Sequence, residues 1–166
     1  MLPSRTTAPA TKRCGTPYNV KKHSMQSIPD CFYRVSVKAL ILNEARDKFL
    51  LCQEASGWWE LPGGGLDWGA TPQEDLPREI KEEMGLETTW VAEHPSYFLT
   101  GESSQLDPAI WIVNVIYEAT VTHLDITPSD ECVAVRFVDK HEVDGLQLFA
   151  GPQTLLTMFD PTRHSK

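Results

Sequence analysis

The sequence contains no apolar run near the roughly 18 residues that a membrane-spanning helix needs, and its N-terminus lacks the apolar core of a secretory signal. Its four cysteines form no CxxC pair and match no zinc or redox spacing. The five histidines show no metal-binding spacing either. These absences argue against a membrane protein and a disulfide scaffold, and we expect a cytoplasmic protein with reduced thiols.

Acidic residues are missing from the first 29 residues, which carry five basic ones: Arg5, Lys12, Arg13, Lys21 and Lys22. Because the whole chain has a net charge of −8 and this segment contributes +5, the remainder carries −13. So acidic a domain has no general affinity for nucleic acid or anionic membranes, and it repels polyphosphates unless cations mediate the contact. We expect a basic, flexible extension over residues 1–27 and a single domain over residues 28–166.

The hydrophobic pattern predicts a mixed sheet with two helices. Segments rich in β-branched and aromatic residues predict strands at residues 31–43, 48–53, 88–94, 96–101 and 133–139. The polar sequence EARD separates the first two as the turn of a hairpin. Residues 109–121 are apolar at nearly every position, which is typical of a strand buried on both faces. With a short terminal helix at 151–159, this order indicates an α/β protein built in layers.

A longer helix is predicted between Thr71 and Gly85. Thr71 is a good N-cap, Pro72 suits the first helical position, and Glu74 completes a T-x-x-E capping box. Gly85 is a suitable C-cap. Apolar residues at four-residue spacing form the stripe that we expect to be buried: Leu76, Ile80 and Met84.

This helix carries a cluster of carboxylates on one side. At about 100° per residue, Glu79, Glu82 and Glu83 share an arc of about 100° beside the apolar stripe. Hard oxygen ligands in such an arc suit Mg²⁺ or Mn²⁺. A solvated acidic face is the alternative, and it would be preferred for an isolated cluster. The glycine turn at residues 63–65 favours the metal site, because glycine lets backbone carbonyls approach a ligand closely.

The stretch Gly64–Leu86 resembles the signature box of the Nudix hydrolases, G-x5-E-x7-R-E-U-x-E-E-x-G-U, where U is a bulky aliphatic residue. The fixed positions that agree after the first glycine are Arg78, Glu79, Ile80, Glu82, Glu83, Gly85 and Leu86. The preceding WELPGG at Trp59–Gly64 is similar to the family's usual lead-in. The resemblance implies an α/β/α sandwich with a mixed sheet, and a metal-dependent pyrophosphohydrolase.

The resemblance also implies roles for individual residues. Glu79, Glu82 and Glu83 would hold Mg²⁺ (or Mn²⁺), with the Gly63 carbonyl as a further ligand. Arg78 would orient the glutamates. Two carboxylates remain open as the general base: Glu79 within the box, and Glu131 in a loop before a late strand, for which a solvated loop acid is an equal alternative.

Two positions of the box region depart from what the family or a regular helix requires. Ala70 stands where the family has a glutamate that helps to hold the box arginine, so we expect Arg78 to be less firmly held. Pro77 lies inside the predicted helix and cannot donate a hydrogen bond to Gln73, which predicts a kink. Both departures leave the carboxylates in place.

Residues for substrate binding are predicted outside the box. Arg34, Ser36 and Lys38 alternate along the first strand and share one face, where they could receive phosphate oxygens. A solvent-facing strand would give the same pattern. Trp58 could stack on a nucleotide base, although core packing is the usual role of such a side chain.

The resemblance therefore implies a Mg²⁺-dependent pyrophosphohydrolase that cleaves the diphosphate linkage of a nucleoside diphosphate derivative. The residues that mark family members acting on NADH, ADP-ribose, dinucleoside polyphosphates or coenzyme A are absent, which leaves nucleoside triphosphates and nucleotide sugars. The alternative is a Nudix-like domain that binds a nucleotide or metabolite without cleaving it. We expect a small nucleotide as partner, with no nucleic acid and no membrane; the sequence predicts no oligomeric state.

Overall fold

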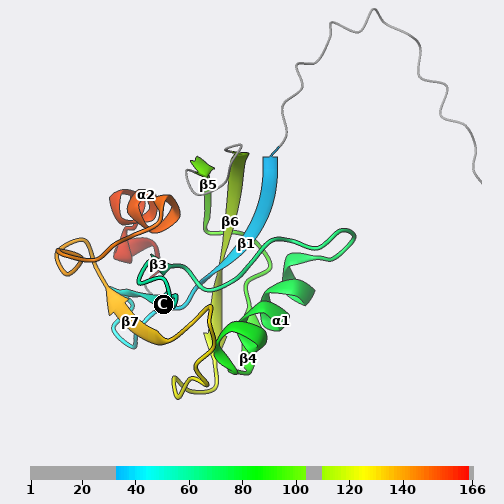
Figure 1. The fold of residues 1–166 in the computed structure, drawn as a ribbon, viewed down its shortest axis with the longest axis horizontal. Coiled ribbons are helices and arrows are strands. Elements are labelled where there is room, and N and C mark those ends of the chain that lie inside the picture. The colour runs from blue at the N-terminus through cyan, green and yellow to red at the C-terminus, as the bar shows by residue number, and fades with distance from the viewer. Residues whose placement is uncertain (1–32, 104–109, 165–166) are drawn as a thin grey trace, which may run out of the picture. The chain divides into compact units, whose positions relative to one another are not determined.

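The computed structural model describes residues 33–103 and 110–164, which form two sheets and two α-helices (Figure 1). The larger sheet contains β1 (Tyr33–Leu40), β4 (Thr88–Val91), β5 (Tyr97–Ser103) and β6 (Ile110–Val121). The smaller sheet contains β2 (Phe49–Gln53), β3 (Trp59–Glu60) and β7 (Ala134–Val138). The helices are α1 (Pro72–Met84) and α2 (Ala150–Met158), followed by a 3₁₀ turn at Pro161–His164.

The larger sheet is mixed, because β6 pairs in parallel with β1 and antiparallel with β4 and β5. Neighbouring residues of β1 belong to different cores, since successive side chains of a strand point to opposite faces. Val37 and Ala39 pack in the core that includes α1, whereas Leu40 packs in the core that includes Leu155 of α2. The two helices therefore cover opposite faces of the sheet (Figure 1), and the predicted layered α/β fold is confirmed.

Helix α1 forms as its local sequence predicts. The Glu74 carboxylate accepts hydrogen bonds from the backbone N–H of Thr71 at 3.0 Å and from its hydroxyl at 2.8 Å. Gly85 adopts the left-handed conformation of a C-cap, with φ of 70°. The stripe Leu76, Ile80 and Met84 is fully buried, and the helix continues through Pro77 to Met84.

Two strand predictions need correction. The hairpin between the first two strands is limited to the residues beside its turn, where Leu42 forms an antiparallel bridge with Phe49. Beyond the turn, β1 pairs with β6, whereas β2 pairs with β3 and β7. The expectation that β6 is buried on both faces is wrong at its ends, where Trp111 and Thr120 are exposed. The reason is that the cores beneath the helices take up residues from the middle and second half of β6: Ile116, Tyr117 and Ala119.

The predicted extension over residues 1–27 lies outside the described residues. Among the described helices, none is long and apolar enough to cross a membrane.

Candidate active site

The glycine turn at residues 63–65 brings backbone against the carboxylates of α1. Gly63 has φ of 111°, and a Cβ added there would lie 2.4 Å from the Val37 carbonyl oxygen. At Gly64, an added Cβ would lie 2.3 Å from Oε2 of Glu79. The Val37 N–H donates to the Gly64 carbonyl at 2.9 Å, which holds the turn beside β1. Position 63 therefore requires glycine, whereas a side chain at position 64 would displace the Glu79 carboxylate.

Two of the three predicted metal-binding glutamates face one cavity of about 310 Å³. Glu83 is 8% exposed and accepts a hydrogen bond from the Gly63 N–H at 2.8 Å. Glu79 lies one turn earlier on α1 and lines the same cavity. Glu82 does not line it; its side chain is 60% exposed and accepts a hydrogen bond from Arg78 at 2.7 Å. The cavity therefore combines Glu79, Glu83 and the Gly63 backbone, with Glu82 outside it.

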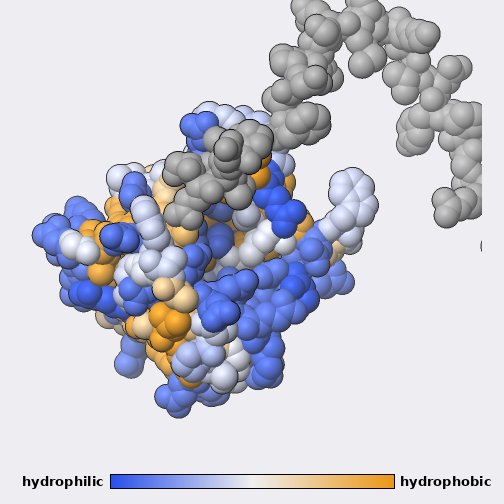
Figure 2. All heavy atoms as spheres, in the orientation of Figure 1, coloured by the Kyte–Doolittle hydropathy of each residue, from blue (hydrophilic) through white to orange (hydrophobic). Residues whose placement is uncertain are grey.

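This space, called the acidic cavity below, is lined by five carboxylates: Glu54, Glu60, Glu79, Glu83 and Glu131. Burial raises the pKa of Glu83 to about 7, against the opposing effect of the Lys38 ammonium. Burial also raises the pKa of Glu60. Hydrophilic residues gather on the outer surface over α1 as well (Figure 2). A cation in the acidic cavity would offset the repulsion among these groups.

Lys38 places one cation in the acidic cavity. It projects from β1, is 9% exposed, and donates a hydrogen bond from Nζ to the Gly63 carbonyl. Burial by itself would lower the pKa of Lys38, but the combined effect of the neighbouring acidic groups, led by Glu60 and Glu83, raises it. The carbonyl predicted to bind a metal ion is therefore hydrogen-bonded to a charged side chain.

Arg78 is held by a residue that sequence analysis did not single out. Asp75 is 3% exposed and accepts hydrogen bonds from Nε of Arg78 at 2.9 Å and from the Asp67 N–H at 2.9 Å. Arg78 also donates to Glu79 at 2.6 Å, and Asp75 and Glu79 together raise the pKa of Arg78. Arg78 is thus fixed although Ala70 has no carboxylate. The i,i+3 spacing of Asp75 and Arg78 was the available signal.

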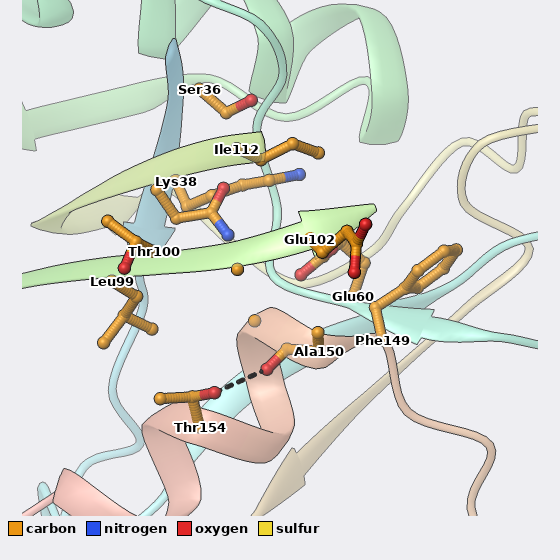
Figure 3. A pocket seen from close by; sticks show the side chains of 13 residues that line it. Ser36, Lys38, Glu60, Leu99, Thr100, Glu102, Ile112, Phe149, Ala150 and Thr154 are labelled. Carbon is orange, nitrogen blue, oxygen red and sulfur yellow. Dashed lines mark hydrogen bonds between the residues drawn. The ribbon is translucent and has the colours of Figure 1, made fainter. Parts of the chain in front are cut away.

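A second cavity, of about 160 Å³, lies between β1, β5, β6 and the start of α2 (Figure 3). We call it the α2 cavity. Lys38 and Glu60 line both cavities, so the two spaces share a wall. Asn114 and Phe149 line the α2 cavity alone. At Gly151 an added Cβ would lie 3.0 Å from the Asn114 amide nitrogen, so glycine lets α2 begin close to β6.

Some of the remaining predicted residues line one of these cavities, and others do not. Glu131 lines the acidic cavity. Trp58 lines neither cavity, but its ring packs against Phe149 with centroids 5.3 Å apart, and Phe149 lines the α2 cavity. Arg34 also lines neither; it is exposed and its guanidinium lies over Gly65, where an added Cβ would be 1.8 Å from Nη2. Of the predicted substrate-binding residues, Lys38 lines both cavities and its strand neighbour Ser36 lines the α2 cavity.

The donors of the acidic cavity suit a hard divalent cation, since they are carboxylate and carbonyl oxygens. Within residues 33–103 and 110–164, no three His, Cys, Asp or Glu side chains already converge to hold a metal ion. The contacts explain why: Glu79 and Glu82 are bound to Arg78, and the Gly63 carbonyl is bound to Lys38. The residues fit a metal ion chemically, and an ion bound to the Gly63 carbonyl or to Glu82 would have to replace the Lys38 or Arg78 contact there.

Comparison with known proteins gives relatives that are named as enzymes acting on nucleoside triphosphates. Nucleoside triphosphatase NudI of Enterobacter sp. (strain 638) is 29% identical over 111 residues, which cover 60% of this chain and 79% of the relative. A candidate 8-oxo-dGTP diphosphatase of Mycobacterium tuberculosis (strain ATCC 25618 / H37Rv) is 32% identical over 101 residues, which cover 61% of this chain. The match spans only 46% of that relative's length.

The crystal structure of the MutT protein from Methanosarcina mazei Go1 has the same fold, with a TM-score of 0.65 at 23% identity. The alignment covers 82% of this chain and 99% of that one. The NUDIX domain matches residues 32–157, which is most of the chain. The predicted family resemblance is therefore confirmed. The chain belongs to the NUDIX domain family.

Proposed function

We propose that this protein is a Mg²⁺-dependent pyrophosphohydrolase that cleaves the diphosphate linkage of a nucleoside triphosphate or a nucleotide sugar. One observation carries the proposal: Glu79, Glu83 and the Gly63 backbone, which come from two separate segments, line one acidic cavity. A solvated acidic face would leave these carboxylates exposed. Glu83 is instead buried and hydrogen-bonded to the glycine turn.

Glu79, Glu83 and the Gly63 carbonyl would hold the metal ion, and Glu82 would join them only after leaving Arg78. Mn²⁺ has similar ligand preferences and is an alternative. When bound, the ion would neutralise diphosphate oxygens and lower the pKa of a coordinated water. Arg78 would keep Glu79 in place, as its hydrogen bond at 2.6 Å supports.

Hydrolysis also needs a group that takes a proton from the attacking water. Glu79 and Glu131 both line the acidic cavity, so either carboxylate would be within its walls when the water attacks. The bond that breaks is a phosphoric anhydride P–O bond. A nucleoside triphosphate would give a nucleoside monophosphate and pyrophosphate, whereas a nucleotide sugar would give a nucleoside monophosphate and a sugar phosphate.

The α2 cavity is the proposed site of the part of the substrate beyond the reacting diphosphate. It shares Lys38 and Glu60 with the acidic cavity, so a ligand can extend from one space into the other. Phe149 offers an aromatic face and Asn114 an amide that can both donate and accept hydrogen bonds. Trp58 would act by supporting Phe149, and Arg34 would act only on substrate groups outside both cavities.

The names of the relatives point to nucleoside triphosphates, including an oxidised one, as the first substrates to test. The full-length chain would be incubated with Mg²⁺ and a panel of nucleoside triphosphates, 8-oxo-dGTP and nucleotide sugars. Anion-exchange chromatography and ³¹P NMR would identify the products. We expect a nucleoside monophosphate from at least one substrate, and EDTA should abolish its formation.

Glu79→Gln is the matched control, because the amide keeps the size of the side chain and loses only its charge. We expect turnover to fall by at least about 100-fold while the circular dichroism spectrum is unchanged. If the chain binds nucleotides but neither the parent nor Glu79→Gln cleaves any of them, a non-catalytic binding domain replaces this proposal. Equal turnover by both proteins would reject the role of Glu79.

A cytoplasmic location and a small-molecule partner complete the proposal. The buried, free thiols of Cys52 and Cys132 support a reducing compartment. The acidic walls of the catalytic cavity support a substrate that arrives with its own cations, in preference to a nucleic acid strand.

A further inference from the structure

Lys38 occupies an unusual position for a lysine. It lies in the middle of β1 with fully buried neighbours on either side, Val37 and Ala39, and it is itself 9% exposed. Lysine is almost never buried unless it is paired. Its ammonium group donates to a backbone carbonyl, that of Gly63, and the carboxylates that favour its charge most are those of Glu60 and Glu83, which line the same cavity. Lys38 is therefore the counter-ion of a cavity that contains an excess of negative charge.

The position of the ammonium group matters more than its charge alone. The Gly63 carbonyl is one of the oxygens that would hold a metal ion, and Gly63 also donates its N–H to Glu83 at 2.8 Å. The ammonium thus sits where one proposed ligand and one proposed carboxylate meet. A divalent cation bound to the same oxygen would be repelled by an ammonium group in contact with it.

We propose that Lys38 is a built-in cation that occupies the Gly63 carbonyl in place of a divalent metal ion, so that the metal ion must displace it to bind. The inference rests on the proposed metal site at Glu79, Glu83 and Gly63. It assigns Lys38 a role as a positioning residue that weakens metal binding to the free protein.

The α2 cavity offers a second position for the displaced ammonium group. Lys38 lines the α2 cavity as well as the acidic cavity, and Figure 3 shows its side chain at the α2 cavity together with Glu60. A nucleotide whose diphosphate spans the shared wall would offer anionic oxygens to the released ammonium. Metal ion and nucleotide would then favour each other's binding, because each stabilises the arrangement in which Lys38 has left Gly63.

The test measures the affinity of the full chain for Mn²⁺ in the absence of substrate. Electron paramagnetic resonance reports the concentration of free Mn²⁺ during the titration. Lys38→Met removes the ammonium and keeps an unbranched side chain. We expect Mn²⁺ to bind at least about tenfold more tightly than to the parent, equivalent to about 1.4 kcal/mol. In EDTA the variant should melt at a lower temperature than the parent, because the carboxylates lose their counter-ion, and Mg²⁺ should raise its melting temperature by more.

Three variants control this experiment. Lys38→Gln removes the charge but keeps a polar side chain, so it should also tighten Mn²⁺ binding, and it remains informative if Lys38→Met fails to fold. Lys38→Arg keeps the charge on a larger, planar group, and it should not tighten Mn²⁺ binding as the uncharged variants do. Lys48→Met removes a lysine that is paired with Glu142, and it should change nothing.

A lysine that only supports the fold predicts the opposite sign, since its loss would loosen the cavity and weaken Mn²⁺ binding. Unchanged or weaker binding by folded Lys38→Met or Lys38→Gln therefore overturns the inference while leaving the proposed function intact. If Glu79→Gln and Glu83→Gln bind Mn²⁺ as the parent does, the metal site itself is wrong, and the inference falls with it.

Discussion

Replacing Glu83 with glutamine tests whether the acidic cavity holds uncompensated negative charge. The Glu83 carboxylate is buried and accepts a hydrogen bond from the Gly63 N–H. The amide oxygen of glutamine can accept the same bond, so Glu83→Gln removes the charge and little else. We expect this variant to be more stable than the parent in metal-free buffer near pH 8.

The size of the effect follows from the pKa of Glu83, which burial raises from 4.5 to about 7. In the unfolded chain the carboxyl group has its ordinary pKa. Since each tenfold difference in proton affinity corresponds to about 1.4 kcal/mol, the charged form costs the folded state about 3 kcal/mol above pH 7. For a domain of this size that is roughly 10 °C in melting temperature.

The pH dependence gives the sign of the effect. Below pH 4.5 the group is protonated in both states, and parent and variant should be equally stable. As the pH rises to about 7, the unfolded chain releases this proton first, so the parent loses stability that Glu83→Gln keeps. Urea unfolding in EDTA between pH 4.5 and 8 measures the difference, with the exposed Glu82→Gln as a control that should change stability by less than about 0.5 kcal/mol.

The same variant should respond less to Mg²⁺. A metal ion that binds only the folded state raises the melting temperature of the parent more than that of a variant without one of its ligands. Turnover by Glu83→Gln should fall by at least about 100-fold. Parallel stability curves for parent and variant from pH 4.5 to 8, or an equal Mg²⁺ response with unchanged turnover, would contradict this account of the cavity.

Three further predictions concern residues around the box. Asp75→Ala should release Arg78 and reduce kcat by about 10–100-fold, and Asp75→Ala combined with Ala70→Glu should recover part of the loss; no recovery would show that a carboxylate at position 70 cannot reach the arginine. Gly63→Ala should lower the free energy of unfolding by at least about 1–3 kcal/mol, because of its positive φ and the contact with β1, as urea denaturation would reveal. Deleting residues 1–27 should leave kcat and KM unchanged, and a loss of turnover in a folded protein would place the extension in the site.

Helix α1 was predictable because its determinants lie close together in the sequence. The N-cap Thr71, the Glu74 partner and the C-cap Gly85 all act within the helix or one residue beyond it. The buried stripe follows from spacing alone. The family box added the expectation that the glycine turn meets this helix, and the approach of Gly64 to Glu79 agrees with it.

The pairing partners of β2 were harder to predict from the sequence, because they depend on contacts between segments that are far apart in the chain. Local signals place a turn after β1, and the structure has that turn, closed by the bridge between Leu42 and Phe49. Whether the hairpin continues is decided by competition with β6 and β7, which follow tens of residues later. The pattern of hydrophobic residues in one strand does not determine which other strand pairs with it.

The role of Asp75 shows a related limit. Reading the box position by position predicted a weakly held Arg78, because Ala70 lacks a carboxylate. The structure instead has a buried carboxylate at Asp75, which contacts both Arg78 and the loop at Asp67. What the arginine requires is an acceptor in the right place, and a side chain on the helix supplies it as well as one in the loop would.

The acidic cluster is partly balanced by a cation on each of two sides, and this has a consequence for how the site works. Arg78 binds Glu79 and Glu82 from along the helix, while Lys38 reaches Gly63 from the sheet. A metal ion must therefore compete with two cations, of which Arg78 is anchored by Asp75. The lysine has no comparable anchor, and it borders a second cavity. Metal binding is thus expected to move Lys38 and leave Arg78 in place, which would direct the released charge toward the space proposed for the nucleotide.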